Sequence, residues 1–352
     1  MKYRTNTKII PYRLEKTVCN NTNRQFERFR LKTTVGYSSH QTCRRPRFRS
    51  KPCRSKCWNF WAENIYSVVL TVVFLAIIPW GRNVWLTADT LISLAFAAIC
   101  TLFPERYLKF QVDGVVDGVH VHMLRLFGLM ILGTSMFGGC ALITKENTTK
   151  TSILWGRVIG LAIYIMAKTH SFMNLRTGTT WNPMALNFGI YGDCLWLLGN
   201  LIYAVSSTDF GGAKTSHGSL NMFLGFDFVQ TFLFAFLFFT FPGPMLGFQC
   251  KEKLRGLHLC IIRMFAAFIF NSAVISGRTP NFPSLTDKVN FLTIRLIVNA
   301  LLVTAQLYTQ LTTDYWTQWH IYFGMVGMSI WSINAAIGYS RAINALKSTK
   351  TE

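Results

Sequence analysis

The sequence predicts an all-α, polytopic membrane helix bundle built from two same-orientation four-helix repeats, with an extra helix before them. Three observations lead to this fold class. Hydrophobic residues make up 51% of the 352 residues and charged residues only 14%, whereas soluble domains average about 25% charged residues. Apolar runs long enough to cross a bilayer follow one another along the chain. The second half of the chain also repeats the first.

Residues 1–57 form a basic tail whose only acidic residues are Glu15 and Glu27, and this tail carries most of the formal net charge of +21. It contains no long apolar run, so it cannot bury enough surface to offset chain entropy, and we expect it to be disordered. Basic segments stay on the cytoplasmic side and gain about 1 kcal/mol per basic residue near anionic lipid. We therefore expect anionic lipids to bind the tail. A nucleic-acid arm or a targeting segment is the alternative, and we expect no nucleic acid partner.

The cysteines favour free thiols in a reducing compartment. Cys43, Cys53 and Cys57 do not form the two short-spaced pairs that are typical of a zinc site. Palmitoylation of Cys53 or Cys57, beside the first apolar run, remains an alternative.

Nine apolar runs are candidate transmembrane helices, because a helix needs roughly 20 apolar residues to cross the hydrocarbon core. They cover residues 64–80, 84–103, 124–144, 151–168, 184–205, 222–241, 258–276, 289–308 and 316–340. The first run belongs to segment 58–82, which we assign to an extra transmembrane or interfacial helix. With a cytoplasmic amino terminus, nine spans place Glu352 outside and eight spans place it inside.

Residues 83–204 align without a gap on residues 221–342, and a short tail of residues 343–352 follows. The identities include Asn83 with Asn221, Asp89 with Asp227, Phe103-Pro104 with Phe241-Pro242, His120 with His258, Arg125 with Arg263, Arg157 with Arg295 and Trp181 with Trp319. Self-similarity at a fixed period indicates a tandem duplication. Each copy holds four spans, an even number, so the copies should share one orientation and be related by an axis along the membrane normal.

A family resemblance rests on residues 84–146 of the first copy. The residues that carry it are Val84-Trp85, Phe103-Pro104, Asp113-Gly114, Arg125-Leu126-Phe127-Gly128, Ala141-Leu142, Thr144 and Glu146. In these positions the chain resembles the tumour-suppressor-inducible four-span membrane protein family. The second copy departs from the pattern, since Lys251-Glu252 replaces Asp-Gly and Ala266 replaces Gly128. The resemblance implies a multi-pass protein linked to growth or adhesion control, without known catalytic residues.

Two carboxylates and two guanidinium groups lie within predicted spans, where an ionisable group costs about 2.5–3.5 kcal/mol on insertion scales and usually has a partner. Asp89 lies on the helix face that the two copies share, which favours an inward position. Arg157 lies at the same depth in a parallel helix. We predict ion pairs between Asp89 and Arg157, and between Asp227 and Arg295. Proton or ion movement, and an unpaired arginine that reaches the headgroups, are the alternatives.

His120 and His258 begin equivalent helices, one turn or so before Arg125 and Arg263. We predict that these four residues face the membrane interface and the lipid headgroups. His120-Val121-His122 and His258-Leu259-Cys260 each offer two metal-ligand types, but residues two apart on a helix point in nearly opposite directions. The sequence therefore predicts no metal site, and it indicates no cofactor.

The sequence contains no nucleophile elbow, Walker loop, dinucleotide fingerprint or metalloprotease helix, so we do not expect an enzyme. We predict an integral membrane protein that acts as a non-enzymatic scaffold or regulator. A transporter or channel with a path at the repeat interface is the alternative. A water-filled cavity around an unpaired Asp89 or Asp227 would favour the transporter, and a dry, packed repeat interface would favour the scaffold. The sequence indicates neither the membrane nor the protein partner.

Overall fold

The computed structural model describes residue 65 and residues 68–174, 180–207, 209, 211 and 218–351. The chain divides into a unit of residues Met1–Pro52 and a unit of residues Cys53–Glu352, and every described residue belongs to the second unit. The basic tail of residues 1–57, with its expected disorder and lipid contacts, lies outside the described residues.

The described residues form an all-α bundle, as predicted. The first half of the bundle contains the helices α2 (Arg82–Leu102), α3 (Pro104–Gln111), α4 (Gly118–Ile143), α5 (Asn147–Met173) and α6 (Pro183–Val205). The second half contains α7 (Gly218–Thr240), α8 (Pro242–Gly247), α9 (Gly256–Arg278), α10 (Leu285–Thr312) and α11 (Gln318–Thr351). Short 3-10 helices are η1 (Ile78–Trp80) and η2 (Thr279–Asn281), and the strands β1 (Val112–Asp113) and β2 (Thr180–Trp181) pair antiparallel.

Eight helices among the described residues are long and apolar enough to cross a membrane: α2, α4, α5, α6, α7, α9, α10 and α11. Even the shortest has 21 residues, or about 32 Å at 1.5 Å per residue, which matches a hydrocarbon core of about 30 Å. The chain is therefore built as a multi-pass membrane protein.

Within the described residues, the predicted span at residues 64–80 is shorter than a full transmembrane helix. The apolar helix there covers Val68–Trp80, which is only about 20 Å long. It packs against the first half, since the Thr71 and Tyr191 hydroxyl oxygens are 2.6 Å apart. The segment before Val68 includes residues that the structure does not describe. Eight full-length candidate spans thus lie in the described residues, and the start of segment 58–82, on which a ninth span depends, lies outside them.

Local sequence signals fix the helix ends. Pro104 and Pro242 stand at the first positions of α3 and α8, where a missing N–H costs nothing, and they end α2 and α7. Asp117 caps α4 by accepting a hydrogen bond from the backbone N–H of His120 at 3.0 Å. Asn182 caps α6 in the same way, through the backbone N–H groups of Met184 and Ala185.

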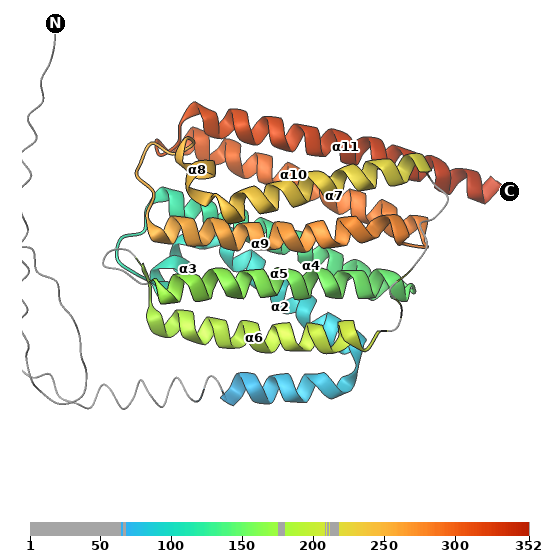
Figure 1. Cartoon of the computed structure of the whole chain (residues 1–352), viewed down its shortest axis with the longest axis horizontal. Coiled ribbons are helices and arrows are strands. Elements are labelled where there is room, and N and C mark those ends of the chain that lie inside the picture. Colours follow the sequence, from blue (N-terminus) through green and yellow to red (C-terminus); the bar gives the residue numbers. More distant parts are fainter. Residues whose placement is uncertain are drawn as a thin grey trace, which may run out of the picture. The chain divides into compact units, whose positions relative to one another are not determined.

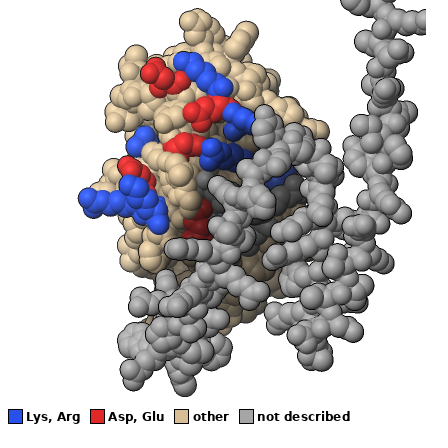
Figure 2. Space-filling view, turned by 90° about the vertical axis from the view of Figure 1, so that its left-hand side faces the viewer, with Lys and Arg blue, Asp and Glu red and all other residues tan. Residues whose placement is uncertain are grey.

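The two halves have the same direction through the bundle: α2 and α7 begin at one end, and α3 and α8 lie at the other (Figure 1). Helix α9 runs between α7 and α5 and also contacts α4, while α4 contacts α10 as well. The halves therefore join along α4, α5, α9 and α10. The end that carries α3 and α8 displays both acidic and basic side chains close together (Figure 2).

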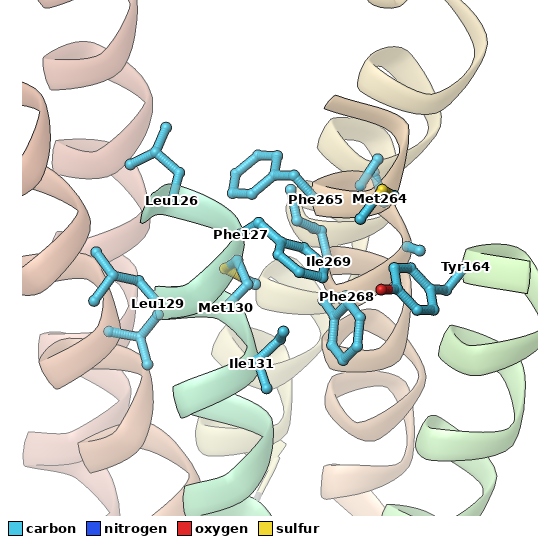
Figure 3. Close-up of a cluster of buried hydrophobic side chains, with 14 of the residues drawn as sticks. Leu126, Phe127, Leu129, Met130, Ile131, Tyr164, Met264, Phe265, Phe268 and Ile269 are labelled. Carbon is cyan, nitrogen blue, oxygen red and sulfur yellow. The ribbon is translucent and has the colours of Figure 1, made fainter. Parts of the chain in front are cut away.

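Apolar side chains fill the space between the halves (Figure 3). The rings of Phe127 on α4, Tyr164 on α5 and Phe268 on α9 form a cluster whose centroids lie 5.4–5.6 Å apart. Gly160 lets α5 approach α9 closely, because a Cβ atom at Gly160 would lie 2.6 Å from the Cβ of Asn271. The centre of the join between the halves is thus apolar and closely packed.

Several contacts within the first half have a counterpart within the second half, at the spacing that the sequence alignment predicts. Lys150 Nζ donates to Asn83 Oδ1 at 3.2 Å, and Lys288 Nζ donates to Asn221 Oδ1 at 3.3 Å. The last helices differ from the gapless alignment, which matches Trp181 with Trp319. The backbone of Trp181 pairs with Val112, whereas Trp316 forms the matching bridge with Cys250. The cause is that α11 begins three residues earlier than the 138-residue alignment with α6 requires.

Replacing Gly160 with leucine tests the close packing of the halves. We expect Gly160→Leu to lower stability by about 1–3 kcal/mol, because the side chain would collide with Asn271. Gly139→Leu is the matched control, since no neighbouring atom lies within 4 Å of a Cβ at that position. Thermal unfolding of the purified protein in detergent measures both. Equal unfolding temperatures for the two variants would contradict close α5–α9 packing.

Candidate functional site

Asp89 on α2 and Arg157 on α5 form a two-pronged ion pair in the first half. Arg157 Nε donates to Asp89 Oδ2 at 2.9 Å, and Arg157 Nη2 donates to Asp89 Oδ1 at 2.5 Å. Both residues are 3% exposed. The predicted contact is therefore present, in the geometry that binds a guanidinium to a carboxylate most strongly.

Two further helices complete this cluster. Trp196 Nε1, on α6, donates to Asp89 Oδ1 at 2.6 Å. Arg157 Nη1 donates to Thr134 Oγ1, on α4, at 3.3 Å, and Arg157 Nη2 also donates to the Ser93 hydroxyl on α2. The charged pair therefore connects all four long helices of the first half, whereas the sequence predicted a connection between two.

The second half contains a corresponding cluster around Asp227 and Arg295, which are 0% and 2% exposed. Arg295 Nη2 and Nε lie 3.1 and 3.2 Å from Asp227 Oδ2. Trp331 Nε1, on α11, donates to Asp227 Oδ1 at 2.7 Å, and Ser276 Oγ, on α9, donates to Asp227 Oδ2 at 2.5 Å. Arg295 also lies over the Trp331 ring, 4.8 Å from its centroid, which adds a cation–π contact.

The last helices of the two halves begin at positions that differ by three residues in the alignment, and this difference explains why the sequence did not predict the two tryptophan partners. The constant alignment matches Trp196 with Asn334, so neither tryptophan was a candidate partner. Once α11 begins three residues earlier, Trp331 occupies the place of Trp196. Aligning the last predicted spans separately, so that Trp196 matches Trp331, would have identified Trp331 as a candidate partner.

We predicted that His120 and His258 face the lipid headgroups, but both lie inside the protein. They are 0% and 1% exposed, and their rings stack with centroids 3.7 Å apart. His258 Nε2 lies 3.1 Å from both carboxylate oxygens of Asp117, and His120 Nδ1 lies 2.8 Å from Asp117 Oδ1. Burial opposes ionisation of Asp117, but hydrogen bonds from His120 and His258 hold its pKa below the ordinary range.

Arg125 and Arg263 are half-buried and bind backbone carbonyls. Arg125 Nε donates to the Thr101 carbonyl oxygen at 3.4 Å, and Arg263 Nε donates to the Phe239 carbonyl oxygen at 3.2 Å. These carbonyls lie in the last turns of α2 and α7, where a cation offsets the negative end of the helix dipole. The two arginines therefore bind helix ends inside the protein instead of reaching toward lipid headgroups.

The sequence did not predict the partly buried ion pair between Lys168 and Asp193. Lys168 Nζ donates to Asp193 Oδ2 at 2.7 Å and lies 4.4 Å from the Tyr164 ring centroid. Asp193 lies in the predicted span 184–205. Its partner was not recognised because the second copy has Gln306 in the place of Lys168.

Gln306 lines a cavity of about 40 Å³ where α4 of the first half meets the second half. Helices α4, α7, α9, α10 and α11 contribute mostly apolar side chains to it, with Gln249, Gln306 and His320 as polar ones. None of the four residues of the two Asp–Arg pairs lines the cavity. The cavity borders the second cluster through Trp331, which binds Asp227.

Breaking the first ion pair should destabilise the protein. Asp89→Asn leaves Arg157 buried without a counter-charge, which typically costs about 3–5 kcal/mol. Adding Arg157→Gln should recover part of that loss. Glu105→Gln is the control, because Glu105 and Lys109 form an ion pair with side chains more than half exposed, where such pairs contribute little.

Thermal unfolding of all four proteins, followed by the loss of monodisperse material, measures these differences. An Asp89→Asn variant as stable as Glu105→Gln, or a double variant without recovery, would contradict the structural role of the pair.

Comparison with known proteins identifies a family and no individual relative. No curated protein and no solved structure matches the chain. A family model with the description "Domain of unknown function (DUF8292)" matches residues 87–340, which include both Asp–Arg clusters and the stacked histidines. Because this match covers well over half of the sequence, the chain belongs to the DUF8292 family.

Proposed function

We propose that this multi-pass membrane protein is a non-enzymatic scaffold or regulator made of two tandem four-helix copies. The observation that carries the proposal is the close packing at the join between the halves, where Phe127, Tyr164 and Phe268 contact one another. Each Asp–Arg pair lies inside one half and has its hydrogen bonds satisfied there. Such pairs fix helix positions, which is the property that a scaffold needs.

A transport path would require a different arrangement at the centre of the bundle. Ionisable groups that move protons or ions face water and change partners. Asp89 and Asp227 are instead almost fully buried, and each accepts a tryptophan N–H in addition to its arginine. These contacts favour fixed charges.

One observation favours the transporter as a second candidate. Trp331, which binds Asp227, also lines the cavity of about 40 Å³. Gln306 Oε1 and His320 Nε2 belong to the residues lining this cavity, and neither atom has a hydrogen-bond partner within the described residues. A cavity of this size holds about two or three water molecules, so it is far smaller than a path through the membrane.

Two finer statements belong to the same proposal. The tandem duplication is supported by the recurring lysine–asparagine and Asp–Arg contacts, with the last helix offset by three residues. The resemblance to the tumour-suppressor-inducible four-span family stays a prediction, and it would make growth or adhesion control the regulated process. Binding of anionic lipids by the basic tail of residues 1–57 likewise stays a prediction, and it would place the bundle at an anionic membrane surface.

Distance measurements between the halves separate the two candidates. Met173 and Leu311 end α5 and α10, one in each half, and both side chains are largely exposed. Spin labels at Met173→Cys and Leu311→Cys, with the reactive native cysteines replaced by serine, report the spacing of the halves in liposomes. We expect one narrow distance distribution that a proton or ion gradient leaves unchanged.

Flux measurements on the same liposomes provide the second readout. We expect proton, sodium, potassium and chloride fluxes equal to those of protein-free vesicles. Two distance populations that a gradient interconverts, or a selective flux that Asp227→Asn abolishes in a folded protein, would overturn the scaffold proposal.

A further inference from the structure

The stacked histidines and Asp117 bring three metal-ligand side chains together at the edge of the bundle. Asp117 lies just before α4, His120 lies in the first turn of α4, and His258 lies in the first turn of α9. One carboxylate oxygen and one ring nitrogen from each histidine all lie within 4.8 Å of one another. The cluster joins the two halves of the chain, and it is separate from the Asp–Arg pairs.

We infer that Asp117, His120 and His258 bind a divalent transition-metal ion of the zinc class. Imidazole nitrogen and carboxylate oxygen are ligands that zinc prefers, and three protein ligands leave a fourth position for water. Zinc–ligand bonds of about 2.0–2.2 Å would draw the three atoms into one coordination sphere and part the stacked rings.

The hydrogen bonds around His120 support a cation at this place. In the structure, His258 Nδ1 accepts the Arg255 backbone N–H at 2.9 Å, so its Nε2 carries a proton that Asp117 accepts. A metal ion on Nε2 would displace this proton and end the hydrogen bond from Arg255. His120 Nδ1 lies 3.3 Å from the Asp117 backbone N–H, which needs a lone pair, and 2.8 Å from the Asp117 carboxylate, which needs a proton. One nitrogen cannot satisfy both. A metal ion bound to the lone pair and to the carboxylate would take the place of the missing proton, and the Asp117 backbone N–H would then lose its acceptor.

Burial of His120 indicates that packing alone does not explain this residue, and a metal ion on Nδ1 would still leave Nε2 without a partner among the described residues. Its Nε2 atom has no hydrogen-bond partner among the described residues, although the side chain is fully buried. A buried polar atom without a partner costs about 1–3 kcal/mol, so the histidine is poorly explained as a packing residue. An apolar side chain would fill the place at lower cost.

Access and stoichiometry follow from the position of Asp117. Its side chain is 13% exposed and precedes the membrane-spanning part of α4, so an ion reaches it from the aqueous edge. The second copy has Arg255 in the place of Asp117, so only one carboxylate serves the two histidines. The chain should therefore bind one ion here, and that ion should hold α4 to α9.

Zinc binding to the purified full-length protein tests the inference. After removal of metal with a chelator, the protein is dialysed against zinc and its metal content is measured, and a competing chromophoric chelator gives the affinity. We expect His258→Ala to lose one equivalent of zinc relative to the wild type. Asp117→Asn should weaken that equivalent at least about tenfold, and asparagine still caps α4.

Cobalt substitution separates this site from the cysteines of the tail. Cobalt bound by Asp117, His120 and His258 should give visible d–d absorption without thiolate charge-transfer bands, and Asp117→Asn should remove that absorption. His170→Ala, at an exposed position, and His320→Ala, at a buried position, are the matched histidine controls and should keep it.

The inference fails if the wild type and both site variants bind zinc with the same stoichiometry and affinity, or if the cobalt spectrum persists in Asp117→Asn. If His258→Ala does not fold, Asp117→Asn decides the outcome alone.

Discussion

The pairing of a carboxylate with a guanidinium inside each half is the interaction on which this bundle depends. An unpaired charge within the apolar bundle would be expensive, so each pair requires that its helices stay at fixed depth and rotation. In the first half the pair binds α2 to α5, with α6 and α4 attached through Trp196 and Thr134. The halves then join through apolar packing and through buried hydrogen bonds such as those from Thr144 and Thr149 to Asp287.

The join between the halves follows a different physical rule. Apolar side chains gain little by leaving lipid for protein, so helices in a membrane associate through close packing and small residues. Gly160 meets Asn271 at short range, and the aromatic rings of Phe127, Tyr164 and Phe268 fill the remaining space. The stacked histidines add a polar contact between the halves at one edge.

Sequence analysis found the parts of the fold that depend on local pattern. The eight long helices coincide closely with apolar runs, and the Asp–Arg contacts followed from a shared helix face and equal depth. It missed the tryptophan partners because a three-residue difference between the copies displaced Trp331 from the alignment. It also missed the cluster of Asp117, His120 and His258. These residues come from the starts of two helices far apart in the sequence, and local spacing does not reveal such contacts.

The central claim is that the Asp–Arg clusters are dry structural connections, and thiol accessibility measures this most directly. Ser93 and Thr231 contact Arg157 and Arg295, and both are buried. Cysteines at these two positions should not react with a small, water-soluble thiol reagent in liposomes, whereas a cysteine at the exposed loop residue Val115 should react readily. Reaction at Ser93→Cys or Thr231→Cys at a rate close to that of Val115→Cys, in folded protein, would contradict the account.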